Sequence, residues 1–233
     1  ILALQQMMSN RNGAFRKLFS QAAENPNTDI RQLQQQILSE FAEALKSPED
    51  MAEAQQKLAE TAENVMKGMI NETEVSTLDL KEMKLAKTQI ELGTKMAKEE
   101  TYQIPVLVGD SVTGISLKIV RGKEEKGRVD ILFGGENIGE VAAQIATDGE
   151  KLEAYIVSDS QSTLEAFRQQ EELFLQMLKE ESGQKAELHY VQAKEPQKVH
   201  MLQTKGEEET SEKTEVQTKT LYHMAESFIK TVQ

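Results

Sequence analysis

An alternation of apolar and polar residues on both sides of a short turn, between residues 141 and 156, constrains the fold more than any other feature. The Asp148-Gly149 pair tolerates positive φ, and it predicts a type I′ turn that pairs two antiparallel strands. The pairing places both apolar sets on one face, as half-buried strands require. The apolar residues are Val141, Ala143 and Ile145 before the turn, and Leu152, Ala154 and Ile156 after it.

A helical period follows this hairpin after Ser158-Asp159-Ser160, and it predicts one long helix that covers the apolar face. Ser162 and Glu165 have the spacing of a capping box, and Gly183 predicts the helix end. The residues that share one side of this helix are Leu164, Phe167, Phe174, Met177 and Leu178. Ala186, Leu188 and Tyr190 then predict one more strand beside the hairpin.

The part of the chain before the hairpin predicts helices first and strands afterwards. Apolar stripes predict four helices: over residues 4–19, from Asp29 to Leu45, and over about 48–70 and 77–96. A bundle is favoured over extended helical hairpins. Strands are predicted at 104–108, 115–119 and 129–133, the first at a sheet edge because it contains Pro105.

The predicted fold class is α+β: an all-helical N-terminal region, then a five- to six-stranded, mostly antiparallel sheet with one long helix packed on it. The predicted domains are 1–100 (helices), 101–192 (the α+β domain), 193–216 (a polar linker) and 217–233 (an amphipathic helix). The last helix is expected to dock on the N-terminal helices or, less favoured, on another protein. The chain starts within a helical pattern at Ile1, which indicates a fragment of a longer protein.

Charge and composition argue for a protein-binding role. The formal net charge of −12 disfavours nucleic acid and anionic membranes, and no apolar run approaches the roughly 18 residues that membrane insertion needs. The chain has no Cys, and its three histidines are not at metal-ligand spacing. We therefore expect no catalytic residue, no metal and no cofactor, and the sequence predicts a binding protein instead of an enzyme.

The Ile138-Gly139-Glu140-Val141 step and a helix of the E-x-x-L-x-x-x-L kind from Glu171 to Leu178, with Phe174 at the first leucine position, resemble the C-terminal domain of flagellar hook-length control proteins. In that family the domain begins P-E-x-L-G-x-V. Here Gly135 stands in place of the proline and Ile138 in place of the leucine. The order of elements is also similar to that of the family: two strands, a polar loop, a helix and a strand.

The resemblance implies a bacterial protein that binds the cytoplasmic domain of the flagellar type III export gate. Such proteins switch export from hook to filament substrates, which is binding and not catalysis. The resemblance also implies a cytoplasmic location, with export through the flagellar apparatus as an alternative. The implied partner-binding residues are Glu136, Asn137, Ile138, Gly139, Glu140 and Val141.

A second function remains open because of the N-terminal half. Its sequence predicts helices, whereas the N-terminal half of hook-length control proteins tends to be a long, poorly structured ruler. A measuring role is therefore left open. In the alternative, the chain is a cytosolic helical adaptor or secretion chaperone. Residues 1–100 and the terminal helix would then clasp a partner through Met-rich faces, which adapt to different surfaces.

Overall fold

A computed structural model describes residues 30–72, 84, 87–88, 91–108, 111–135, 138–203 and 214–232. The chain divides into two compact units: Ile1–Ala44 with Pro48–Gly114, and Leu45–Ser47 with Ile115–Gln233. The predicted α+β class is confirmed, with N-terminal helices, a six-stranded sheet and a C-terminal helix. None of the helices in the described ranges is long and apolar enough to cross a membrane. The domain boundaries drawn from the sequence stay predictions.

The first unit contains α3 (Ile30–Ala44), α4 (Pro48–Glu72), helical residues 91–97 and β1 (Thr101–Val108). The helix expected over residues 4–19 lies outside the described residues. Side chains at helical spacing fill the core of this unit: Ile37, Phe41, Met51, Ala54, Leu58 and Ala62. Gln55 is buried on α4, and its Nε2 donates to the Gln103 carbonyl at 2.7 Å, which ties α4 to β1.

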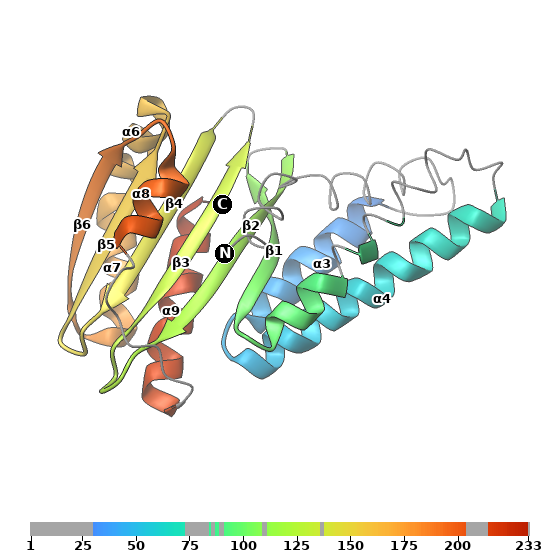
Figure 1. Ribbon diagram of the computed structural model, residues 1–233, viewed down its shortest axis with the longest axis horizontal. Coiled ribbons are helices and arrows are strands. Elements are labelled where there is room, and N and C mark those ends of the chain that lie inside the picture. Colours follow the sequence, from blue (N-terminus) through green and yellow to red (C-terminus); the bar gives the residue numbers. More distant parts are fainter. Residues whose placement is uncertain are drawn as a thin grey trace. The chain divides into compact units, whose positions relative to one another are not determined.

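The six strands lie in the sheet in chain order, so that β1 with Pro105 is at one edge, as expected, and β6 is at the other (Figure 1). The others are β2 (Ser111–Arg121), β3 (Gly127–Gly135), β4 (Gly139–Thr147), β5 (Lys151–Ser158) and β6 (Lys185–Gln192). β2 to β5 pair antiparallel, and β6 is parallel to β5.

The β4–β5 hairpin has the register that the alternation predicts, with Ala143 opposite Ile156 and Ile145 opposite Ala154. The predicted turn type is wrong. In the fully described loop only Gly149 has positive φ (94°), whereas a type I′ turn requires it at both central residues. The Asp148 side chain stabilises the loop instead, because its Oδ1 accepts from the Glu150 and Lys151 amides at 3.0 and 2.9 Å.

Two helices replace the one long helix that was predicted, α6 (Gln161–Gln169) and α7 (Glu171–Ser182). Gln170 between them has φ −99° and ψ 4°, outside the helical region. A one-residue bend leaves Phe167 and Phe174 buried on the same side, so the apolar pattern gives no sign of it. Gly183 ends α7 in the left-handed conformation, as predicted.

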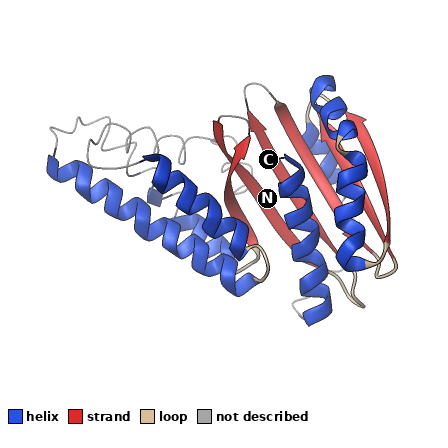
Figure 2. Ribbon diagram, turned by 180° about the vertical axis from the view of Figure 1, so that it is seen from behind, coloured by secondary structure: helices blue, strands red, loops and turns tan. Residues whose placement is uncertain are grey.

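The C-terminal helix α9 (Glu215–Val232) packs against α7 and β3 within its own unit. The predicted targets, the N-terminal helices or another protein, are therefore wrong. Phe228 on α9 is fully buried and lies 5.7–6.1 Å, ring to ring, from Phe133, Phe167 and Phe174. Figure 2 shows these helices covering one face of the sheet, and we call it the helix face.

The opposite face carries α8 (Pro196–Gln203), which contacts β4 and β5 (Figure 1). This helix lies within the segment predicted to be a polar linker. Its first residue, Pro196, is buried, which is compatible with the first turn of a helix because proline lacks an amide donor. The linker expected from composition therefore contains a short packed helix. Composition alone did not indicate it, because the segment has few apolar residues.

Candidate partner-binding site

The six residues predicted to bind a partner form the segment from the end of β3 to the start of β4, the 136–141 segment. Glu136 and Asn137 lie outside the described residues. The amide of Ile138 donates to the Gly135 carbonyl at 3.3 Å, and Gly135 is paired with Gly139 across the strands. The described residues therefore form the base of a tight connection between two antiparallel strands.

Gly139 has a backbone conformation that favours glycine, with φ at 66°. A Cβ at this position would overlap the Oδ1 atom of Asp159, so the second reason for glycine is space. The same Oδ1 accepts the Glu140 amide at 2.8 Å, and the Asp159 amide donates to the Glu140 carbonyl at 3.3 Å. Close approach of the Asp159 carboxylate thus explains the glycine of the Ile-Gly-Glu-Val step.

Two hydroxyl groups fix the same segment to the start of α6. Ser158 Oγ donates to the Glu140 carbonyl at 2.9 Å, and Thr163 Oγ1 donates to the Ile138 carbonyl at 2.8 Å. Ser158 is the last residue of β5 and Thr163 lies in the first turn of α6, so both follow the segment by about 20 residues along the chain. Residues 138–140 are therefore held in place by hydrogen bonds from residues 158–163.

The predicted capping box at Ser162 is displaced from the observed cap by two residues. Ser160 is the N-cap of α6, and its Oγ accepts the Thr163 amide at 3.3 Å. Ser162 lies in the first turn, exposed, with its Oγ 2.9 Å from that of Ser160. The sequence reading recognised this stretch only as a loop and a cap. It missed the contact of Asp159 and Thr163 with the 136–141 segment.

Exposure separates the predicted binding residues into two groups. Val141 is fully buried and pairs with Phe133 and Ser158, so it belongs to the core of the sheet. Ile138 and Glu140 are half-buried, and each side chain keeps some surface for a partner. If the segment binds another protein, Ile138 and Glu140 are its contact residues.

The part of the chain that runs from this segment to the end of β6 has a strongly negative formal charge. Residues 138–192 contain eleven Asp and Glu against four Lys and Arg, a formal charge of −7. Part of this charge is stabilised locally, because the Lys151 and Glu150 amides lower the pKa of the Asp148 carboxyl. Burial and the nearby Glu171 carboxylate raise the pKa of Tyr190 on β6. The surface therefore favours a basic partner.

A hollow at the opposite end of β4 and β5 has no excess of negative charge. It lies between the β2–β3 loop and the β4–β5 loop, and its charged residues are Lys123, Lys126 and Lys151 with Glu124, Asp148 and Glu153. The lysines pair with the acidic residues, at 2.6 Å for Lys151–Glu153 and 3.9 Å for Lys126–Glu124. The hollow therefore offers no net charge for an anion or a cation.

Two of the three histidines, His189 and His223, take part in packing. His189 stacks on Tyr155 with ring centroids 4.7 Å apart. His223 links α9 to α7, because its Nε2 lies 2.7 Å from the Met177 carbonyl oxygen. The residues described by the structure contain no group of three or more His, Asp or Glu that could hold a metal ion.

Comparison with known proteins gives no family for this fold and site. No family model matches the chain, and no curated protein and no solved structure is significantly similar to it. The class of protein follows from the structure alone. It is an α+β chain with an acidic β-sheet unit in which residues 138–140 are hydrogen-bonded to residues 158–163.

Proposed function

We propose that this chain is a non-enzymatic flagellar protein, similar to hook-length control factors. It binds the cytoplasmic domain of the type III export gate and so switches substrate specificity. The observation that carries the proposal is the arrangement of the 136–141 segment. A glycine step similar to that of the family is followed by β4, a turn with a glycine, β5, a polar loop, two helices and β6. Asp159 in the polar loop accepts the Glu140 amide of the segment.

The charge of the unit supports the same proposal. An acidic surface associates quickly with a basic partner, and the association weakens as salt screens the charges. The half-buried Ile138 and Glu140 provide one apolar and one acidic contact on a backbone that is already ordered. A preorganised surface costs little conformational entropy on binding.

The alternative function is that of a helical adaptor. The N-terminal helices that it requires are present, but the second binding element, the terminal helix, is not available. In that reading the terminal helix clasps a partner. The apolar side of α9 is instead buried in its own unit through Leu221, Met224, Ala225 and Phe228. We therefore favour the sheet unit as the binding part.

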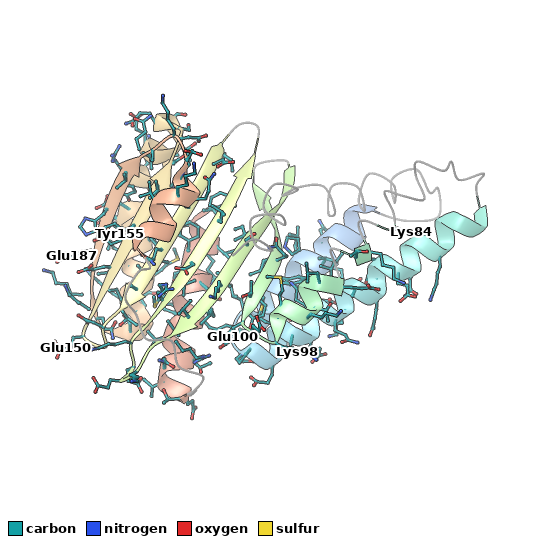
Figure 3. All side chains as sticks on the ribbon, viewed as in Figure 1. Lys84, Lys98, Glu100, Glu150, Tyr155 and Glu187 are labelled. Carbon is teal, nitrogen blue, oxygen red and sulfur yellow. The ribbon has the colours of Figure 1, made fainter. Side chains whose placement is uncertain are left out.

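The test is the binding of the full chain to the purified export-gate domain, measured by calorimetry at low and high salt. We expect binding that weakens as salt rises. Glu140→Lys is expected to weaken it at least tenfold. The matched control is Glu150→Lys, which changes the charge equally on the exposed β4–β5 loop, beyond the far end of β4 (Figure 3).

The strand β4 separates these two positions by about 25–30 Å, at roughly 3.3 Å per residue. Equal weakening by both variants would mean that only net charge matters and that the 136–141 segment is not the contact. Absence of binding by the unmodified chain would refute the proposed function.

A further inference from the structure

The strand β6 ends the sheet, and its outer edge is paired with no other strand in the described part of the chain. Along a strand, the backbone groups of successive residues point alternately to the two edges. The Ala193 amide donates to the Ser158 carbonyl of β5 at 3.0 Å, so odd-numbered residues of β6 bond towards β5. The amides and carbonyls of Ala186, Leu188, Tyr190 and Gln192 therefore point outward.

Edge strands that avoid unwanted pairing carry charged residues. In β6 these lie in the first half only, where Lys185 and Glu187 form an ion pair at 3.5 Å. The second half, residues 188–192, has no charged residue. The helices α6 and α7 contact β6 from the helix face, and no strand among the described residues pairs with its outer backbone edge.

The uncharged half of β6 leads to the 136–141 segment. The side-chain amide of Gln192, the last residue of β6, donates to the Asp159 carbonyl at 3.5 Å, and Asp159 holds the Glu140 amide. Only β5 lies between β4 and β6, a separation of about 10 Å. An extended segment on the outer edge of β6 would lie one strand spacing further out, about 15 Å from the start of β4, within reach of a partner that also contacts Ile138 and Glu140.

Charge selects the kind of segment that fits. The part of the chain that includes this edge is acidic, with eleven Asp and Glu against four Lys and Arg over residues 138–192, and Glu187 on β6 is exposed (marked in Figure 3). The positive groups next to β6 are Lys185, paired with Glu187, and Arg168, which lies over the Tyr190 ring. A second copy of the chain, with a net charge of −12, would bring like charges together. A segment that carries Lys or Arg would instead meet a part of the chain with the opposite net charge.

We propose that the outer edge of β6 accepts an extended, basic segment of the partner as a seventh strand, paired through the backbone of residues 186–192. This inference rests on the proposed function and names the chemistry of the partner. Backbone pairing supplies affinity in such strand addition, and alternate side chains supply specificity.

Amide hydrogen exchange, resolved by NMR in the ¹⁵N-labelled full chain, tests the inference. The probes are a capped peptide of alternating Lys and Thr, the same peptide with Glu for Lys, and the export-gate domain. We expect the basic peptide and the gate domain to slow exchange at least tenfold at Ala186, Leu188, Tyr190 and Gln192. The acidic peptide is expected to leave it unchanged.

Two variants at one position provide the matched control. Leu188→Pro removes an outward amide and leaves the bonds to β5 in place, because proline is tolerated where the amide faces away from the sheet. Leu188→Ala removes a similar amount of side chain and keeps the amide. We expect Leu188→Pro to weaken binding of the basic peptide at least tenfold and Leu188→Ala less than threefold.

The outcomes separate this inference from the proposed function. Gate binding that does not slow exchange on β6 would overturn the edge site and leave the proposed function in place. Slowing by the basic peptide without gate binding would support the edge site and overturn the function. If neither the basic peptide nor the gate domain slows these amides, the inference is wrong, whether or not Leu188→Pro folds.

Discussion

Gly139→Ala should destabilise the sheet unit more than a change of glycine to alanine normally does. The left-handed conformation alone costs an alanine about 1–2 kcal/mol. The added methyl group also overlaps the Asp159 carboxylate, which must move away from the Glu140 amide that it holds at 2.8 Å. A hydrogen bond to a charged group contributes about 1.5–3 kcal/mol, and the exposure of Asp159 favours the lower value. The expected loss of unfolding free energy is therefore about 2.5–3.5 kcal/mol.

Urea unfolding followed by circular dichroism measures this loss, and Gly183→Ala is the matched control. Gly183 has nearly the same φ (64°), but no atom lies within 4 Å of an added Cβ, so only the conformational cost of about 1–2 kcal/mol applies. The effect of glycine on the unfolded chain is the same in both variants and cancels. In an Asp159→Ala background the overlap with the carboxylate is absent. Gly139→Ala should then cost little more than the conformational part, with a small addition because Ser160 Cβ would lie 3.3 Å from the added methyl group. Equal losses for Gly139→Ala and Gly183→Ala in the unmodified background would refute the reasoning.

Three further predictions concern the same unit. Ser160→Ala should lower the unfolding free energy by about 1 kcal/mol through loss of the α6 cap, and Ser162→Ala should leave it almost unchanged in the same urea titration. Phe228→Ala should cost about 3–5 kcal/mol, because the ring is fully buried among three aromatic rings, and an unchanged urea midpoint would contradict that packing. The pKa of Tyr190 is raised in the folded chain, so its contribution to stability is complete below pH 10.0, the ordinary tyrosine value, and is lost as pH rises above it. Tyr190→Phe should therefore reduce the alkaline fall in stability, and an identical pH profile would argue against burial of the hydroxyl group.

The strand order could be predicted from the sequence because each strand carries its own signal. A period of two allows only one register once one face is buried, and the turns between β2 and β5 are short. The docking of α9 could not be predicted in the same way. Its apolar stripe indicates that one side is buried, but the contact with β3 joins residues about 95 positions apart. Nothing local specifies that contact.

The 136–141 segment shows the same division between local and distant information. The glycine at 139 is visible in the sequence, but its cause, Asp159, is 20 residues away and looks like an ordinary loop residue. The helix cap was misplaced for a related reason. Ser160 and Ser162 both precede a helical pattern, and only the Oγ–amide bond from Thr163 distinguishes them.

The fold alone explains two residues of the motif on which the family resemblance depends, Gly139 and Val141. Evidence for binding must therefore come from other positions. Gly139 is required by its φ and by the Asp159 carboxylate, and Val141 is required by the core. Any chain that joins this hairpin to this polar loop would keep both residues, whatever it binds. The positive φ and the full burial that require Gly139 and Val141 do not apply to the half-buried Ile138 and Glu140, nor to the outer edge of β6, which pairs with no strand among the described residues. Substitutions there can change binding without changing the fold, so these positions decide between a recognition surface and a purely structural motif.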